Sequence, residues 1–573
     1  MPLTFTSEND FQWIVRKIVV VGPGIVGMPM AALLADAKIR EGSDEPAKVL
    51  VLQRNSENSG WKVAAINRGE TVIGGVEPGL DAIAAQAVKE GILSATSSYD
   101  DVADADMILV SVQTDKDGFG PDYGPLFGAL EGVAKALVTR PKGNVPVVVF
   151  ESTLAPSSMT TVVRDLFARH GLIEGKDVLL GNSPNRVMPG RLVERVAESD
   201  KLIAGLHPLT PVLIKRIYSK IVTKGVLHQT NSMTAEVVKT LENAYRDVRI
   251  AFAAELVRQC DANDIDFFAL RDQVNARLNQ SDNASGSATA VPSGAILVPS
   301  IGVGGHCLPK DGILLWWRKY ETGADTSRSL ILKSRVINDE APLESIKLAE
   351  KTFGKIDGKK IALLGAAYRF DSEDTRNSPT LSLGKLLIER GCDVRIHDPY
   401  VKPDDQNLKK FGLTGQFTND LVKAIGDADF IFFCVGHGVY GAQINEIVSL
   451  ARSASGVFDG ANLFAAEQFA GRLSYAGIGR GTKAPTSELT DFTIESFKAM
   501  EQGVANELNE LIEFLNDKYA TDVFNQVSLD VVRQLAGTCV TGCEIGYPTP
   551  RPQAPNMDQF SMRLVGTAAA QPA

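Results

Sequence analysis

The chain has 573 residues, of which 44% are hydrophobic and 22% charged, so it can form several globular domains without help from disulfides or metals. A formal net charge of −10 argues against a nucleic-acid-binding protein, because such proteins carry a basic face. The six cysteines show no tight spacing pattern, which is typical of a reducing compartment. We therefore expect a cytoplasmic protein that binds no nucleic acid.

An uncharged stretch near the N-terminus, residues 18–35, approaches the length of a membrane span. Three glycines and two prolines fall within its first dozen residues, however, and argue against a membrane helix. The preceding Glu8 and Asp10 are unlike the basic start of a signal peptide. The stretch is interpreted as a buried strand, a turn and a helix, and no membrane insertion is expected.

Strand and helix patterns alternate through the first part of the chain. Lys17–Val21 predicts a strand, Met28–Ala37 a helix and Lys48–Leu52 a second strand. Short apolar runs at residues 108–110 and 147–150 continue the series. This rhythm is typical of a parallel sheet with helices on both faces.

The pattern changes at residue 234. From Thr234 to about Asp261 there is no Gly or Pro, and apolar residues recur at helical spacing. This predicts one helix roughly 40 Å long. Its length and apolar pattern suggest a homodimer through this helix. The small, polar segment Ser281–Gly294 predicts a mobile loop.

A second α/β unit begins near Lys359, with strands expected at residues 361–365, 394–396 and 430–433. A helical pattern at residues 489–515 follows, and the Pro-rich residues 547–573 predict a disordered tail. The fold class is therefore α/β, with two Rossmann-like, doubly wound parallel-sheet domains joined by a long central helix. The expected domain boundaries are 1–232, 233–345, 346–481 and, for a helical extension with the tail, 482–573.

Gly22-Pro23-Gly24-Ile25-Val26-Gly27 forms a G-x-G-x-x-G pattern between the first strand and the first helix. The glycines allow a tight turn and close approach of a pyrophosphate to the helix N-terminus, which favours dinucleotide binding over a merely structural turn. The acidic residue that normally ends the second strand is absent, and Gln53 and Arg54 stand there. Gln53 can accept a ribose hydroxyl, whereas Arg54 either favours a 2′-phosphate or is simply solvated. NAD and NADP both remain open.

Three glycines precede a cysteine in Gly302-Val303-Gly304-Gly305-His306-Cys307-Leu308-Pro309-Lys310-Asp311. The glycines let the backbone wrap closely around a ligand, so a nucleophilic role of Cys307 is favoured over a packing role. No metal site is expected, because no second ligand pair stands at zinc-finger spacing. On the long helix, Lys239 and Asn243 share one face at i and i+4, which by itself is as typical of a solvated face as of a site.

The chain resembles the UDP-glucose/UDP-N-acetylmannosamine dehydrogenase family from residue 16 to about residue 481. The motifs that carry the resemblance occur in the family's order. They are Gly22–Gly27, Glu77–Leu80, Glu151–Thr153, Ser183–Gly190, Lys239–Glu255, Gly302–Asp311, Asp374–Pro379 and Asp398–Tyr400. The helix segment at residues 242–252 and His306 before the cysteine look like the branch that acts on N-acetylhexosamines.

The resemblance implies oxidation of the C6 alcohol of a UDP-N-acetylhexosamine, of mannosamine or glucosamine type, to a uronic acid for polysaccharide precursor synthesis. Two NAD molecules act in turn, and the aldehyde passes through a thiohemiacetal and a thioester on Cys307. Lys239 and Asn243 would stabilise the oxyanion. Asp311, with a water positioned by Thr153, would take up protons.

The resemblance also implies binding residues. Those expected at the cofactor are Gly22, Gly24, Ile25, Val26, Gly27, Gln53, Arg54, Thr114, Thr153 and Arg376. Those expected at the UDP-sugar are Asn185, Arg186, Val187, Met188, Lys239, Asn243, Gly302, Gly304, Gly305, Tyr368 and Arg369.

Two departures bear on this assignment. Asn185 stands where the family usually has a Glu associated with thioester hydrolysis, and Ala461 stands where it commonly has an Arg at the substrate. The alternatives are a UDP-glucose 6-dehydrogenase, a single-step hydroxyacid dehydrogenase, and a catalytically silent nucleotide-sugar sensor or scaffold. The hydroxyacid class has no Cys-bearing glycine loop, and the catalytic set around Cys307 argues against a silent protein.

Overall fold

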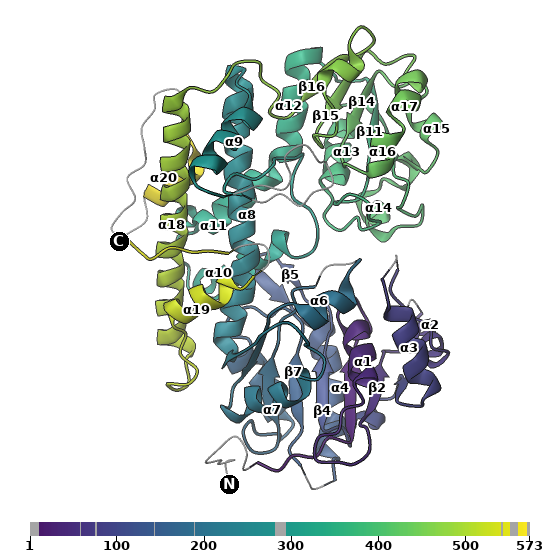
Figure 1. Ribbon diagram of the computed structural model, residues 1–573, viewed down its shortest axis with the longest axis vertical. Helices are drawn as coiled ribbons and strands as arrows, with labels where there is room; N and C mark the ends of the chain where they lie inside the picture. Colours follow the sequence, from purple (N-terminus) through teal and green to yellow (C-terminus); the bar gives the residue numbers. More distant parts are fainter. Residues whose placement is uncertain are drawn as a thin grey trace. The chain divides into compact units, whose positions relative to one another are not determined.

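The computed structural model describes residues 11–57, 59–74, 77–141, 144–187, 190–280, 294–539, 543–549 and 560–569. The chain splits into two compact units. The first comprises the chain up to Glu242 together with Ile313–Ala324 and Leu508–Glu544. The second comprises Asn243–Gly312, Asp325–Glu507 and the chain from Ile545. Figure 1 labels the elements of both.

The sheet of the first unit has the strand order β10-β9-β8-β7-β4-β1-β2-β3. Its strands are β1 (Lys17–Val21), β2 (Lys48–Leu52), β3 (Leu93–Thr96), β4 (Met107–Val110), β7 (Val147–Phe150), β8 (Leu179–Asn182), β9 (Lys201–Gly205) and β10 (Leu227–Asn231). An antiparallel hairpin, β5 (Asp115–Asp117) and β6 (Gly120–Asp122), follows β4. The predicted strands at 17–21, 48–52 and 147–150 are confirmed residue for residue.

One expectation about this sheet is wrong, because the sheet is not parallel throughout. Strand β9 pairs antiparallel with β8, and β10 pairs parallel with β9. The segment at residues 183–200, which contains α6, leads from the end of β8 to a β9 that runs the opposite way. The strand therefore begins at the same edge at which β8 ends, the edge where the carboxyl ends of the parallel strands meet.

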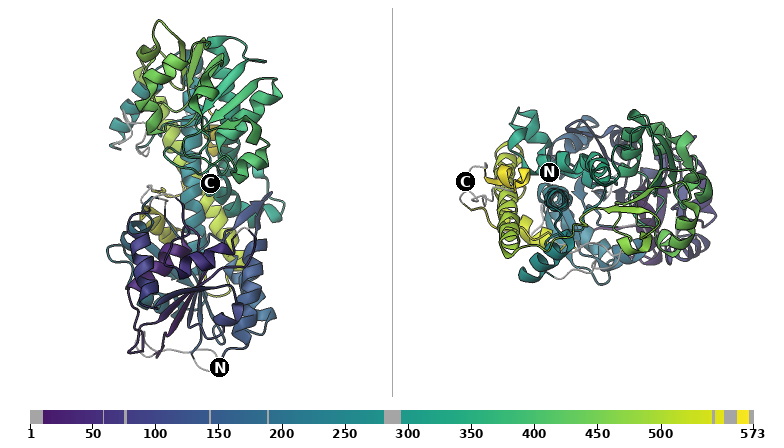
Figure 2. Two further views of the ribbon diagram at one scale, coloured as in Figure 1. Left: turned by 90° about the vertical axis from the view of Figure 1, so that its right-hand side faces the viewer. Right: turned by 90° about the horizontal axis from the view of Figure 1, so that it is seen from above.

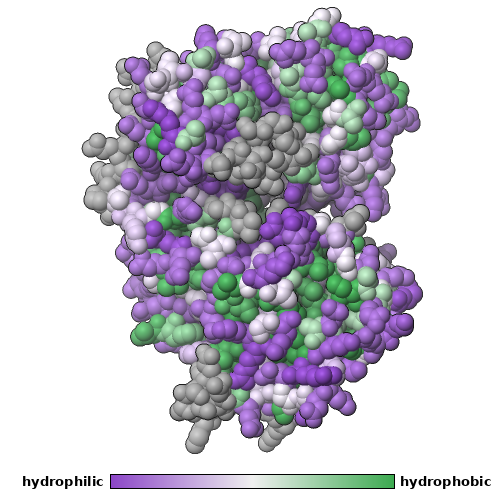
Figure 3. Space-filling view, viewed as in Figure 1, coloured by the Kyte–Doolittle hydropathy of each residue, from purple (hydrophilic) through white to green (hydrophobic). Residues whose placement is uncertain are grey.

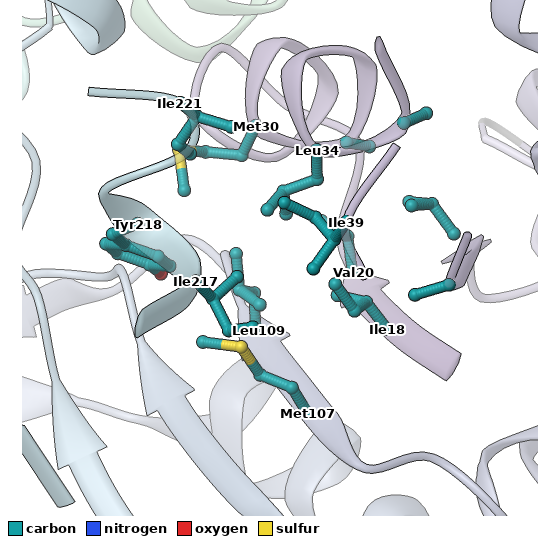
Figure 4. Close-up of a cluster of buried hydrophobic side chains, with 14 of the residues drawn as sticks. Ile18, Val20, Met30, Leu34, Ile39, Met107, Leu109, Ile217, Tyr218 and Ile221 are labelled. Atoms are coloured by element: carbon teal, nitrogen blue, oxygen red, sulfur yellow. The ribbon is translucent and has the colours of Figure 1, made fainter. Parts of the chain in front are cut away.

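Two apolar layers enclose this sheet, because successive side chains of a buried strand point to opposite faces. Ile18 and Val20 of β1 join one core cluster, whereas Val19 and Val21 join the other. Figure 4 shows the first cluster, where Ile18 and Val20 lie near Leu34 of α1. The helices of this unit are α1 (Gly27–Asp36), α2 (Trp61–Asn67), α3 (Leu80–Lys89), α4 (Gly124–Val138), α5 (Arg164–Arg169), α6 (Leu192–Glu198), α7 (Leu209–Tyr218) and α19 (Leu529–Gly537).

The sheet of the second unit has the order β13-β12-β11-β14-β15-β16, and all its pairings are parallel. Its strands are β11 (Lys360–Leu364), β12 (Asp393–His397), β13 (Phe417–Thr418), β14 (Phe430–Phe433), β15 (Gly456–Asp459) and β16 (Ser474–Gly477). The helices are α9 (Phe267–Arg277), α11 (Leu330–Asp339), α12 (Ala341–Phe353), α13 (Pro379–Glu389), α14 (Gln406–Phe411), α15 (Leu421–Ile425), α16 (Gly438–Ala442), α17 (Ile444–Leu450) and α20 (Arg563–Ala569). The fold class predicted from the sequence is confirmed.

Three helices contribute residues to both units: α8 (Ser232–Asn263), α10 (Leu308–Glu321) and α18 (Ser487–Tyr519). The predicted central helix corresponds to α8, and the helical pattern at residues 489–515 corresponds to α18. Figure 2 gives two further views of these helices. The predicted mobile loop at residues 281–294 lies outside the described residues except for Gly294.

The expectation of a disordered tail at residues 547–573 is wrong for its last described segment. Residues 563–569 form α20, in which Leu564, Val565 and Ala568 are buried. Arg563 forms ion pairs with Glu255 and Glu340, which lie on α8 and next to α11. Residues 550–559 and 570–573 of the predicted tail lie outside the described residues.

No helix in the described part of the chain is long and apolar enough to cross a membrane. The uncharged stretch at residues 18–35 is instead most of β1, the glycine turn and most of α1, as predicted. In the view of Figure 3, hydrophilic side chains break up the hydrophobic surface over both units.

Candidate active site

The glycine turn joins β1 to α1, and each of its glycines has a distinct reason to lack a side chain. Gly22 has φ +89°, a left-handed conformation that favours glycine. A Cβ at Gly27 would lie 2.1 Å from the carbonyl oxygen of Gly22, so only glycine lets the helix start this close to the strand. A Cβ at Gly24 would meet nothing within 4 Å, which leaves open space where a pyrophosphate would lie. Ile25 and Val26 complete the turn.

Gln53 and Arg54 follow the end of β2, next to this turn. The Gln53 Nε2 atom donates to the Arg54 carbonyl at 3.1 Å and to Ser59 Oγ at 3.0 Å. Because these bonds use the amide nitrogen, Oε1 is the atom suited to accept a ribose hydroxyl. The Arg54 side chain is exposed.

Thr114 and Thr153 lie beyond the ends of β4 and β7, at the same edge of the sheet. The Thr114 hydroxyl is buried and donates to the Thr153 carbonyl at 2.7 Å, which ties the two segments together. The residues of the first unit predicted to bind the cofactor therefore share the carboxyl edge of its parallel strands, where open α/β sheets bind ligands.

Hydrogen bonds to a buried polar network hold the side chain of Asn185. Its Nδ2 donates to the Glu151 carboxylate, and its Oδ1 accepts a hydrogen bond of 3.1 Å from Lys201 Nζ. Lys201 also pairs with Glu151 at 2.8 Å, and the Tyr218 hydroxyl donates to the same carboxylate. Burial lowers the pKa of Lys201 against the opposing effect of Glu151. Burial and Glu151 together raise the pKa of Tyr218.

The sequence reasoning missed Lys201 and Tyr218, because each is a single residue on an apolar strand or helix. Arg186 was expected at the substrate, but its guanidinium is held by protein groups. It pairs with Glu242 of α8 and donates to the Leu535 carbonyl at 3.1 Å and to Thr538 Oγ1 at 2.9 Å. Val187 is half-buried beside it, and the predicted Met188 lies outside the described residues.

The second unit brings together three of the polar residues near the cysteine. Asn243 Nδ2 donates to Asp311 Oδ2 at 2.6 Å, and Lys310 Nζ donates to Asp311 Oδ1 at 2.8 Å. Asp311 is fully buried, so its charge depends on these two partners. Lys310 was not predicted as a site residue. Lys239 lies one turn before Asn243, in the part of α8 that belongs to the first unit, and is buried.

Cys307 is exposed and caps the N-terminus of α10. The backbone N–H groups of Lys310 and Asp311 donate to the Cys307 carbonyl at 3.1 and 2.9 Å, so the helix begins directly after the cysteine. The positive end of a helix dipole favours a thiolate, and the G-x-G-G spacing alone did not predict this placement.

The glycines before Cys307 are packed against the segment that follows β11. A Cβ at Gly304 would lie 2.5 Å from Cβ of Tyr368 and 2.8 Å from the Asn377 carbonyl. The Gly305 N–H donates to the Arg376 carbonyl at 2.8 Å, and its own carbonyl accepts from Asn377 Nδ2 at 2.9 Å. Gly302, at φ +147°, would meet Pro379. The loop is thus fixed by backbone contacts that a larger residue would prevent.

Arg376 places a cation near the thiol. Its guanidinium is bound to the Asp374 carboxylate, which raises the pKa of Arg376, and the charge of Cys307 contributes to the same shift. The interaction is reciprocal, so Arg376 favours the thiolate form of Cys307. Burial raises the pKa of Tyr368, whose ring lies next to Gly305. Arg369, beside it, lies over the Phe370 ring.

Residues 459–462, where Ala461 replaces the family's Arg, support the same loop. Asp459 is buried and accepts N–H groups from Ala461, Leu463 and Phe464. A Cβ at Gly460 would lie 2.3 Å from Cγ2 of Ile301, directly before Gly302. Ala461 offers no polar side chain to a ligand. In the described ranges, no group of three or more His, Cys, Asp or Glu side chains could hold a metal ion.

The sequence matches three domains of one family along most of its length. The NAD-binding domain of the UDP-glucose/GDP-mannose dehydrogenase family matches residues 16–222, its central domain residues 233–340 and its UDP-binding domain residues 362–466. The glycine turn fits NAD, and the matched domain identifies NAD as the cofactor.

Individual relatives agree with these matches over nearly their full length. The chain is 30% identical to the UDP-N-acetyl-D-mannosamine dehydrogenase of Pyrococcus horikoshii over 469 residues, 81% of this chain and 99% of the relative. It is 31% identical to that of Campylobacter jejuni, covering 76% of this chain and 98% of the relative. The crystal structure of the NDP-N-acetyl-D-galactosaminuronic acid dehydrogenase of Methanosarcina mazei Go1 is 32% identical, with a TM-score of 0.67 over 82% of this chain and 96% of that one. The chain therefore belongs to the UDP-glucose/GDP-mannose dehydrogenase family and is an NAD-dependent nucleotide-sugar dehydrogenase.

Proposed function

We propose that the protein oxidises the C6 alcohol of a UDP-N-acetylhexosamine to the carboxylate in two steps, through a thioester on Cys307. The observation that carries the proposal is the position of Cys307. Its thiol is exposed at the N-terminus of α10, on a loop fixed by Tyr368 and Asn377, with the Arg376 cation near it.

The chemistry explains why a cysteine is needed. Bound NAD supplies the acceptor for each of the two hydrides. After the first oxidation, the Cys307 thiolate adds to the aldehyde carbon, and the carbonyl oxygen becomes an oxyanion that takes a proton. The hydroxyl of this thiohemiacetal gives up its proton as the second hydride leaves, which forms a thioester, and attack by water releases the acid and the thiol.

Asn243, Lys239 and Asp311 are proposed to handle the charges and protons of these steps. Asn243 hydrogen-bonds to Asp311, which keeps the amide oriented, and Lys239 lies one turn away on α8. The two side chains would stabilise the oxyanion, and Asp311 would exchange protons with a water positioned by Thr153. Lys310 holds the Asp311 carboxylate in place.

Hydrolysis of the thioester is proposed to proceed without Asn185 acting as a base. Both ends of the Asn185 amide are bound to Glu151 and Lys201, and an amide does not take up a proton at neutral pH. Asp311 is then the carboxylate in the described catalytic set that can activate water.

The N-acetylhexosamine assignment rests on the relatives and on the sequence. Two relatives act on UDP-N-acetyl-D-mannosamine by name, and the residues at 242–252 and His306 point the same way. UDP-glucose is the alternative substrate. A silent sensor is disfavoured because Asn243, Lys310 and Asp311 form a hydrogen-bonded set.

Polysaccharide precursor synthesis, a cytoplasmic location, a homodimer, and the division at residues 232, 345 and 481 stay predictions. So do the cofactor role of Arg376 and the substrate roles of Arg186, Val187, Met188, Gly302, Gly304, Gly305, Tyr368 and Arg369.

The test is the number of NADH molecules formed per sugar, measured across UDP-N-acetylmannosamine, UDP-N-acetylglucosamine and UDP-glucose at matched concentrations. We expect the wild type to form two NADH per N-acetylated sugar. Cys307→Ala should form no more than the one NADH of the first oxidation and should still bind NAD. Two NADH from Cys307→Ala would contradict the thioester. Turnover of UDP-glucose at least as fast as every N-acetylated sugar would overturn the substrate assignment alone.

A further inference from the structure

The family's domains end at residue 466, whereas the chain continues into α18 from Ser487 and on to α20. One face of α18 is apolar and buried, with residues at the spacing of a packed helix. They are Leu489, Phe492, Phe497, Met500, Val504, Leu508, Leu511 and Leu515. We call residues 487–569 the C-terminal extension.

In the second unit, α18 packs on the central helix. The Phe252 and Phe497 rings meet edge to face, with centroids 5.6 Å apart, and the Arg249 guanidinium lies 6.0 Å from the Phe497 centroid. The Tyr245 hydroxyl donates to Glu501. Figures 1 and 2 show α18 alongside α8.

The extension also contacts the neighbouring helices. Glu510 of α18 pairs with Lys319 of α10 at 2.8 Å. The Glu507 carboxylate is buried and accepts the Ser329 hydroxyl at 2.6 Å and the Leu330 N–H at 2.8 Å, at the start of α11. A carboxylate at a helix N-terminus is stabilising, so these are favourable contacts.

Two later parts of the extension also reach α8 or the residue before it. In the first unit, Asn231 Nδ2, at the residue before α8, donates to the Gln526 carbonyl at 2.8 Å. In the second unit, Glu255 of α8 accepts the Leu564 N–H at 3.0 Å and pairs with Arg563 of α20.

Most of α8 is covered by other parts of the same chain. Every residue from Ser232 to Val257 is buried or partly buried within a single chain. The homodimer expected from the sequence would need an apolar face of this helix. Pairing through the central helix is therefore not supported. The sequence pattern shows which residues of the helix are apolar, but not which part of the chain covers them.

We propose that the C-terminal extension takes, in cis, the face of α8 that a second copy of the chain would otherwise need for pairing. The extension then supports α8, α10 and α11 within one chain. Any assembly of the protein uses a different surface.

A zero-length cross-link tests whether the contact is made within one chain. A water-soluble carbodiimide joins the Glu510 carboxylate to the adjacent Lys319 amine as an amide and is itself converted to a urea. We expect the 319–510 cross-linked peptide, identified by mass spectrometry, in the band of a single 61.5 kDa chain on a denaturing gel. Glu198 and Lys224, 2.6 Å apart within the first unit, serve as the internal standard, and Lys319→Arg should abolish only the 319–510 product.

The same peptide found only in a band of two chains would overturn the proposal, because the extension would then serve a partner. Absence of the peptide while the 198–224 product forms would overturn it as well.

A second measurement does not depend on cross-linking. Phe497→Asp places a charge against Phe252, so we expect faster proteolysis of the extension and a higher mass by light scattering as α8 becomes exposed. Lys498→Asp, at the exposed neighbouring position, should keep the wild-type mass and resistance. If Phe497→Asp behaves like Lys498→Asp, the extension does not cover α8 and the proposal fails. Because the cross-link uses the unmodified chain, misfolding of this variant leaves that test intact.

Discussion

The side-chain amide of Asn243 donates a 2.6 Å hydrogen bond to the carboxylate of Asp311, which is fully buried. Residues 68 positions apart are thus joined where α8 passes the first turn of α10. The carboxylate is acceptor-only when ionised, so this bond fixes the orientation of the amide and leaves the second N–H of Asn243 Nδ2 to donate to a ligand. A substitution at Asn243 or Asp311 therefore changes the hydrogen bonding of the other residue.

Asn243→Asp should therefore impair turnover through Asp311. Two carboxylates within hydrogen-bonding distance cannot both ionise, so one pKa of the pair rises. We expect kcat to fall by roughly 10²-fold at neutral pH, as for loss of one oxyanion donor, with the acid limb of the pH–rate profile moved to higher pH. Asn263→Asp, at the end of the same helix, is the control and should leave the profile unchanged. An unmoved acid limb in Asn243→Asp would separate the two residues.

Arg376→Gln should make the Cys307 thiol less acidic. The cation and the thiolate interact favourably, so removing the cation disfavours the charged form. We expect the pH midpoint of Cys307 alkylation, followed by mass spectrometry of its peptide, to move upward. Arg472→Gln, an exposed arginine of the same unit, should not change the midpoint. A midpoint equal to that of the wild type would leave the helix N-terminus as the main cause of thiolate formation.

Local patterns predicted the elements of this fold, and long-range contacts account for the errors. The strands at 17–21 and 147–150 and the helix α8 follow from apolar periods and from Gly and Pro breakers, which act over a few residues. The direction of β9 depends on its pairing with β8, and α20 depends on Glu255, more than 300 positions away. No local pattern carries that information.

The candidate site divides in the same way. The glycine turn and the loop before Cys307 were predicted because their glycines are required by backbone geometry. Lys201 was missed because a single Lys at the start of an apolar strand ordinarily faces solvent. The partners of Arg186, at Leu535 and Thr538, lie in the extension, about 350 positions away, and nothing in the Arg186 segment indicates them.

Arg54→Ala should leave NAD use nearly unchanged. The side chain of Arg54 is exposed. The hydrogen bond that Gln53 donates to Arg54 goes to the backbone carbonyl of Arg54, not to its guanidinium. If the guanidinium serves a 2′-phosphate, the substitution lowers kcat/KM with NADP alone. Steady-state kcat/KM with both cofactors measures this. A tenfold preference of the wild type for NADP over NAD would contradict the cofactor assignment.

Asn185→Glu should destabilise the protein rather than restore a hydrolytic base. In the structure the Asn185 amide donates to Glu151, and Lys201 is the buried cation of this network. A glutamate at position 185 would place a second carboxylate against the first, with one ammonium between two charges. One carboxyl then keeps its proton, and its pKa in the folded protein rises above the unfolded value.

The sign of the pH dependence follows. A carboxyl whose pKa is raised on folding contributes stability that is present below its unfolded pKa and is lost as pH rises through the folded pKa. The melting temperature of Asn185→Glu should therefore fall below that of the wild type by more at pH 8 than at pH 5. Asn185→Asp, whose shorter side chain meets the same network, should show the same direction. Single-turnover experiments should show no faster release of acid in Asn185→Glu, because the new carboxyl would point into the Glu151–Lys201 network. A variant as stable as the wild type at pH 8, with faster acid release, would show that position 185 faces the thioester instead.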